Sequence, residues 1–108
     1  MTDLKLEYLF VMQKTLQEKL KVNVTSKEYL HQMILGILSE VNEVLNETPW
    51  KSWKKNQEFN KENFRKEIID VWAFLINISL IAELTPQELY DEFKEKYKIN
   101  MERASTDY

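Results

Sequence analysis

Apolar residues recur every three or four positions through most of this chain, which is the spacing of helices that bury one face. Short polar segments interrupt this pattern and contain signals that start helices. The pattern predicts an all-α fold, a four-helix bundle. The expected helices cover about residues 4–20, from the 25–28 segment to 47, 61–83 and 86–98.

Three segments predict where helices begin. Thr25-Ser26-Lys27-Glu28 and Thr85-Pro86-Gln87-Glu88 have the spacing of a capping box, in which the first and fourth residues satisfy each other's backbone N–H groups. Asn60 is placed to cap the helix between them. We expect Pro49 to end the second helix and residues 98–108 to form a C-terminal tail.

Two acidic pairs, Glu40-x-x-Glu43 and Glu67-x-x-Asp70, interrupt apolar helical stretches. Each pair shares one helix face. Glu40 falls inside the apolar arc of its helix, and Gly36, one turn earlier, is expected to leave space beside the carboxylates. Converging carboxylates repel one another unless a hard cation such as Mg²⁺ lies between them. Periodicity alone leaves open both a metal site and two pairs of bridged surface carboxylates.

The third predicted helix is apolar almost all round from Val71 to Ile81. A helix without a polar face is either central or lies at a subunit interface. Four helices of this length can hardly cover it within one chain. We therefore expect a homodimer or a dimer of dimers.

Composition restricts the class of protein. At 108 residues the chain is expected to form a single domain, 1–108. One glycine argues against folds built on glycine-rich loops, and the lack of cysteine excludes disulfides and thiolate chemistry. The net charge of −3 gives no electrostatic reason to bind nucleic acid or acidic membranes. No signal peptide or bilayer-length apolar stretch is visible, so we expect a soluble, cytoplasmic protein.

Five ordered motifs resemble those of the all-α nucleoside triphosphate pyrophosphatases, which include the dimeric dUTPases, MazG-like enzymes and phage dCTPase–dUTPases. The two acidic pairs look like the metal signature of this superfamily. The other motifs favour the dUTPase branch, in the form of a short phage-type or Firmicutes-type enzyme. These motifs are Gln13-x-x-Leu16, Pro49-Trp50-Lys51-Ser52-Trp53-Lys54, Asp70 followed by Phe74, and Lys96-x-x-x-Asn100-x-x-Arg103 ending in Tyr108.

The resemblance implies a dUTP diphosphatase that depends on Mg²⁺, with Mn²⁺ as an alternative ion. It implies that Glu40 orients or deprotonates the attacking water. The implied metal ligands are Glu40, Glu43, Glu67 and Asp70. The implied phosphate contacts are Lys51, Lys54, Lys96, Asn100, Arg103 and Tyr108. The implied base and sugar contacts are Gln13, Trp53, Phe74 and Asn77.

Alternatives remain open at this level. Ala73 stands where the dUTPase branch usually has histidine, which favours a broader MazG-like enzyme or a dCTP pyrophosphatase as the alternative activity. The apolar third helix also suits a helical interaction module without catalysis. Among single residues, Asn77 could simply be a buried asparagine satisfied by a neighbouring helix, and Trp50 could simply pack in the turn.

Overall fold

The computed structural model describes residues 4–106, which form helices and connecting loops without any strand. This confirms the predicted all-α class and the number of helices. The four helices are α1 (Lys5–Leu20), α2 (Lys27–Asn46), α3 (Lys61–Ile81) and α4 (Pro86–Thr106).

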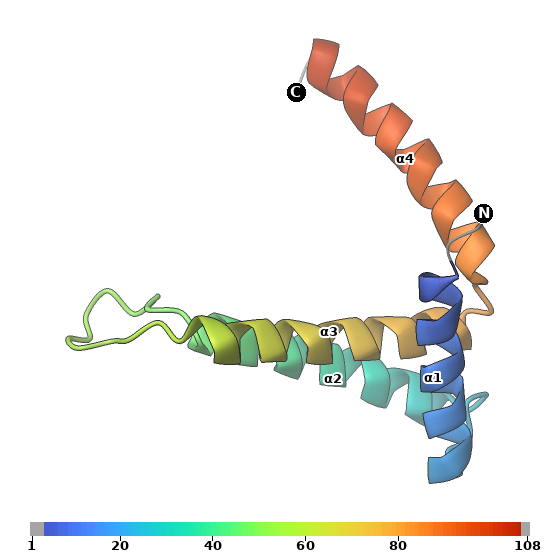
Figure 1. The fold of residues 1–108 in the computed structure, drawn as a ribbon, viewed down its shortest axis with the longest axis horizontal. Helices are drawn as coiled ribbons and strands as arrows, with labels where there is room; N and C mark the ends of the chain where they lie inside the picture. The colour runs from blue at the N-terminus through green and yellow to red at the C-terminus, as the bar shows by residue number, and fades with distance from the viewer. Residues whose placement is uncertain (1–3, 107–108) are drawn as a thin grey trace.

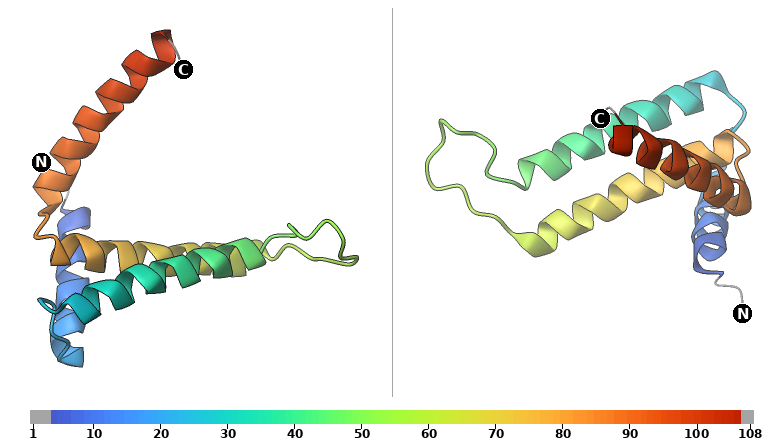
Figure 2. Two further views of the ribbon diagram at one scale, coloured as in Figure 1. Left: turned by 180° about the vertical axis from the view of Figure 1, so that it is seen from behind. Right: turned by 90° about the horizontal axis from the view of Figure 1, so that it is seen from above.

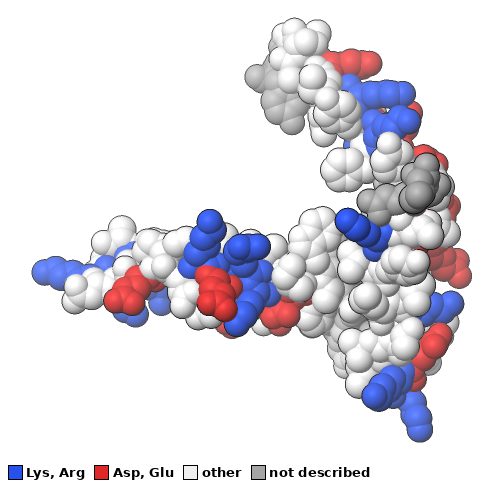
Figure 3. All heavy atoms as spheres, in the orientation of Figure 1, with Lys and Arg blue, Asp and Glu red and all other residues white. Residues whose placement is uncertain are grey.

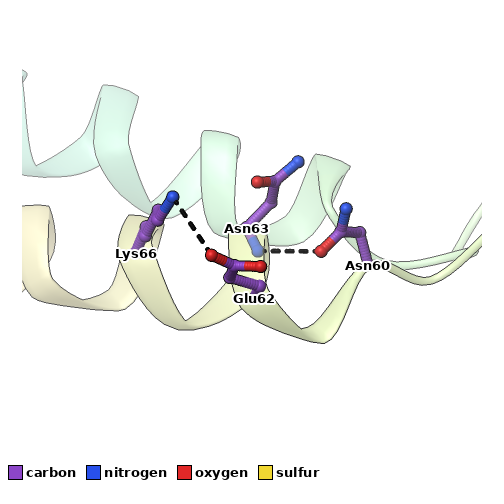
Figure 4. Close-up of polar contacts among 4 residues, drawn as sticks. All are labelled: Asn60, Glu62, Asn63 and Lys66. Atoms are coloured by element: carbon purple, nitrogen blue, oxygen red, sulfur yellow. Dashed lines mark hydrogen bonds and ion pairs between the residues drawn. The ribbon is translucent and has the colours of Figure 1, made fainter.

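Local hydrogen bonds explain where three of these helices start. The Asn60 side chain accepts from the Asn63 N–H at 3.0 Å, as predicted (Figure 4). Thr85 and Glu88 form the reciprocal capping box, with both bonds at 3.1 Å, and the Thr85 N–H is the main cause that holds the pKa of Glu88 below its usual value. The cap of α2 differs from the prediction: Ser26, not Thr25, accepts from the backbone of the third helical residue.

The predicted C-terminal tail is helical up to Thr106, so the expected end of the fourth helix near Lys98 was wrong. The segment contains neither proline nor glycine, and Met101, Glu102, Arg103 and Ala104 all favour the helix. No residue in this stretch therefore ends the fourth helix near Lys98.

Helices α2 and α3 run side by side as an antiparallel hairpin, and α1 crosses one end of it (Figures 1 and 2). Helix α4 leaves the same end, bent by 104° from α3 (Figure 1). Among the described helices, α4 comes close only to α1. The single chain thus forms three packed helices and a projecting fourth, so the expected four-helix bundle is not formed within one chain.

The core of this arrangement is small. Among residues 4–106, the buried apolar side chains are Phe10, Tyr29 and Ile76, at 4, 7 and 7% exposure. Gln17 is also buried and accepts a hydrogen bond of 2.6 Å from the Tyr29 hydroxyl, which ties α1 to α2. Large apolar residues remain exposed on every helix, for example Leu38 on α2, Trp72 on α3 and Phe93 on α4.

The hollow between α1 and α3 belongs to this uncovered surface. It has a volume of about 440 Å³, and Figure 3 shows a broad uncharged area where α1 crosses the hairpin. Its lining residues are Leu6, Leu9, Met12, Gln13, Ile69, Trp72, Ala73 and Ile76.

No single described helix has the length and hydropathy needed to cross a membrane, although the bent pair of α3 and α4 meets that criterion when taken together.

Candidate metal centre

Pairing of α2 with α3 brings three of the four predicted metal ligands together. One carboxylate oxygen each from Glu40, Glu67 and Asp70 lies within 4.8 Å of the other two. Glu40 and Glu67 are half-buried between the helices, and Asp70 is exposed. We call these three residues the acidic cluster. It consists of one residue from the first acidic pair and both residues from the second.

The donor set of the acidic cluster suits a hard divalent cation. Carboxylate oxygens bind Mg²⁺ at about 2.0–2.1 Å, so neighbouring ligands of an octahedral ion are about 2.9 Å apart and opposite ligands about 4.1 Å apart. The three oxygens, within 4.8 Å of one another, are close to these spacings. Glu40, Glu67 and Asp70 could therefore hold Mg²⁺ or Mn²⁺.

The electrostatics of the acidic cluster agree with this. The pKa of Glu67 is raised, first by loss of hydration and then by the negative charges of Asp70, Glu40, Glu43 and Glu47. Protonation or a bound cation can each relieve such crowding, and the two therefore compete for the site.

Lysines pair with carboxylates elsewhere on the surface. Lys66 lies 3.5 Å from Glu62 on α3, and Lys98 lies 3.4 Å from Glu95 on α4. Figure 4 shows the first pair beside the Asn60 cap, with both side chains largely exposed. Exposed pairs of this kind contribute little to stability.

Glu43, the fourth predicted ligand, lies outside the acidic cluster. Its side chain is exposed, yet its charge still raises the pKa of Glu67. Glu47 exerts the same effect and is half-buried, although it was not among the predicted site residues. Its spacing of seven residues from Glu40, two helical turns, could have indicated that it lies on the same face.

Phe74 occupies the next turn along the contact between α2 and α3. Its ring lies against the backbone of Gly36, where a Cβ atom would overlap Phe74 Cε1 and lie 2.9 Å from Cδ1 and Cζ. The space that we expected Gly36 to leave open beside the carboxylates is therefore filled by Phe74. Phe74 itself is half-buried.

Gln13 and Asn77 meet one turn beyond Phe74. Gln13 Nε2 donates to Asn77 Oδ1 at 2.8 Å and, more weakly, to the Ala73 carbonyl at 3.5 Å. Asn77 Nδ2 in turn donates to the sulfur of Met33 at 3.6 Å. Asn77 thus has hydrogen-bond partners on both α1 and α2. This agrees with the alternative that Asn77 simply bonds to neighbouring helices.

The segment 49–54, with its two tryptophans and two lysines, lies in the loop that joins α2 to α3 at the free end of the hairpin (Figure 1). Its two tryptophan rings meet edge to face at 5.7 Å, and Lys51 Nζ lies 5.7 Å from the ring of Trp50. The Gln57 side chain closes the loop by donating to the carbonyls of Lys51 and Lys54. Trp53 is 71% exposed, and its ring contacts that of Trp50.

The remaining predicted phosphate contacts are on α4. Lys96, Asn100 and Arg103 are exposed there, and α4 approaches neither α2 nor α3. A single chain therefore does not bring them to the acidic cluster. Tyr108 lies outside the described residues.

Comparison with known proteins assigns the chain to a family. A family model described as dUTPase matches residues 5–88, which contain α1 to α3 and both acidic pairs. No curated protein and no solved structure gave a match. Because the match spans most of the chain and the fold is all-helical, this chain belongs to the all-α dUTPase family.

Proposed function

We propose that this chain is a Mg²⁺-dependent nucleoside triphosphate pyrophosphatase that prefers dUTP and produces dUMP and pyrophosphate. The observation that supports this most is the acidic cluster, because it lies within the segment that matches the dUTPase family. In this reaction, the oxygen of water bonds to the α-phosphorus, and the bond between that phosphorus and the oxygen bridging to the β-phosphate breaks.

Glu40, Glu67 and Asp70, with Glu43 at the edge, would hold the metal. When bound, Mg²⁺ would neutralise charge on the triphosphate and lower the pKa of a coordinated water. Glu40 would orient the attacking water or accept its proton. Its half-buried position between two helices suits that role, because partial exclusion of water strengthens local electrostatic interactions.

The nucleoside would lie along the contact between α2 and α3, next to the acidic cluster. Phe74 would contact the base or sugar, and the Gln13–Asn77 pair would offer hydrogen-bonding amides one turn further on. Trp53 would reach the nucleotide from the loop.

The phosphates would be contacted from two directions. Lys51 and Lys54 belong to the loop between α2 and α3, the helices that carry the acidic cluster. Lys96, Asn100 and Arg103 would have to come from α4 of a second copy, because α4 of the same chain projects away from the hairpin (Figure 1). Tyr108, outside the described residues, is kept as a proposed phosphate contact.

We further propose that the active protein is a homodimer or a dimer of dimers. The three buried apolar side chains of residues 4–106 are a small core for a domain of this length, and long apolar stripes remain uncovered. Examples are Ile34, Leu38, Val41 and Leu45 on α2, spaced as in a helix–helix seam. Light scattering should give a multiple of the monomer mass of 13.1 kDa at micromolar concentration; a stable monomer would contradict this proposal.

The activity is tested by measuring pyrophosphate release from dUTP with Mg²⁺ and with a chelator. We expect Mg²⁺-dependent release by the natural chain, a large loss in Glu40→Gln, and unchanged release in Glu92→Gln, which makes the same substitution on an exposed part of α4. Absence of release by the natural chain, or equal release by Glu40→Gln, would reject the proposal.

A panel of nucleotides tests the alternative activities. Ala73 contributes only its carbonyl to the polar group around Gln13, so no histidine is available there to read the base. Equal rates with dUTP, dCTP and other nucleotides would favour the broader MazG-like activity. A purely structural interaction module would show no Mg²⁺-dependent binding of a non-hydrolysable dUTP analogue in calorimetry.

A further inference from the structure

Gly36 and Phe74 make a close contact directly beside the acidic cluster. Gly36 is one helical turn before Glu40 on α2, and Phe74 is one turn after Asp70 on α3. A Cβ atom at position 36 would overlap Phe74 Cε1, with Cδ1 and Cζ both at 2.9 Å. The two helices can therefore hold the ring in this place only if residue 36 has no side chain.

The backbone at Gly36 does not itself require glycine. Gly36 lies in the interior of α2 and has no positive φ angle. Glycine is unfavourable inside a helix compared with alanine, because it has more conformational freedom to lose. The chain has a single glycine and uses it at this position, where its benefit is the room that it leaves for the ring.

The neighbours of Phe74 limit where a displaced ring could go. Asp70 and Glu67 precede it on α3, and on the following turn Asn77 is held by Gln13 and donates to Met33 of α2. The ring thus lies between the carboxylates and a polar group that is already bonded. An added Cβ would have to push the ring out of the helix contact, towards solvent or towards the acidic cluster.

We propose that Gly36 is a positioning residue that seats the Phe74 ring at the nucleoside end of the metal centre. This inference rests on the proposed function. Gly36 itself touches neither metal nor nucleotide; it fixes the height of the ring above α2, and the half-buried ring in turn limits the depth to which a base or sugar enters beside the carboxylates.

The test compares the natural chain with Gly36→Ala, Phe74→Leu and the double variant. Ser39→Ala is the matched control, because it also places alanine in the middle of α2 but on an exposed position. For Gly36→Ala we expect KM for dUTP to rise about tenfold with a much smaller change in kcat, since the three atoms nearest to the added Cβ all belong to the Phe74 ring and none to a carboxylate. We also expect the ratio of kcat/KM for dUTP and dCTP to change.

The double variant separates positioning from general damage. Leucine lacks Cε1, the atom that a Cβ would overlap, and Cζ, so adding Gly36→Ala to Phe74→Leu should leave KM unchanged. The same addition should raise the unfolding temperature of Phe74→Leu, because alanine favours the helix, whereas it should lower that of the natural chain. This comparison remains informative if Gly36→Ala alone folds poorly.

The outcomes distinguish this inference from the proposed function. A natural chain that neither hydrolyses nor binds dUTP overturns both. A natural chain that hydrolyses dUTP, together with a folded Gly36→Ala variant whose KM and base preference match those of Ser39→Ala, overturns the positioning role alone. An effect of Gly36→Ala on KM that persists in the Phe74→Leu background also overturns it.

Discussion

We predict that Mg²⁺ stabilises this protein against heat and that replacing Glu40 with glutamine removes most of that stabilisation. Three carboxylate oxygens within 4.8 Å of one another, two of them from half-buried side chains, form the acidic cluster. Glutamine preserves the size of Glu40 but removes one of the three charges that attract the ion. The variant therefore perturbs metal binding with little change in packing.

The expected magnitude follows from mass action. An ion present at a hundred times its Kd stabilises the folded state by about 2.7 kcal/mol, which raises Tm by about 10–20 °C for a domain of roughly 100 residues. Loss of a direct ligand should raise Kd by at least about a hundredfold, the upper end of what even outer-shell substitutions cause. At the same Mg²⁺ concentration the stabilisation then falls to about 0.4 kcal/mol, or about 2–3 °C.

The assay is thermal unfolding followed by circular dichroism at one fixed protein concentration, because Tm of an oligomer depends on concentration. Mg²⁺ is titrated from chelator to saturation for the natural chain, Glu40→Gln and the control Glu92→Gln. In chelator, Glu40→Gln should melt above the natural chain at neutral pH, because one of the crowded charges is gone. Equal Mg²⁺-induced shifts in all three proteins would refute the assignment of the acidic cluster as a metal site.

Three further predictions concern the titration of Glu67, the buried Tyr29–Gln17 hydrogen bond and the cap of α4. The pKa of Glu67 is raised above its ordinary value of 4.5, so the folded state holds that proton to higher pH than the unfolded state does. In chelator, Tm should therefore fall as pH rises from 4.5 through the raised pKa. The variant Glu67→Gln should show a smaller fall of Tm over the same pH range. A pH–Tm series measures this, and identical slopes would contradict it. Tyr29→Phe leaves the buried Gln17 oxygen unpaired and should cost about 1–3 kcal/mol in urea unfolding, whereas Tyr29→Phe combined with Gln17→Leu should recover most of the loss. Thr85→Ala removes one bond of the α4 capping box and should cost about 1 kcal/mol of helix stability, seen as faster amide exchange in the first turn of α4; exchange at the natural rate would count against the cap.

Short-range pattern was sufficient for the features that depend on neighbouring residues. Helix spacing identified four helices, and Asn60 and the Thr85–Glu88 box mark real helix starts. Such features are predictable because a helix has a fixed period and a cap bonds to a backbone group only a few residues away. The same local rule failed at the end of α4, where no residue stops the helix.

Packing between helices decided the rest. The two acidic pairs are equivalent in spacing, yet only Glu40 of the first pair joins Glu67 and Asp70, because the rotation of α2 against α3 depends on contacts between residues far apart in the chain. The same packing fills the space at Gly36 with Phe74 and joins Gln13 to Asn77 across α1 and α3. The direction of α4, which carries Lys96 and Arg103 away from the acidic cluster, likewise follows from the turn after α3 and not from any pattern within α4. Helical periodicity determines which side chains share a face, whereas the offset and rotation between two faces come from close packing of non-local side chains.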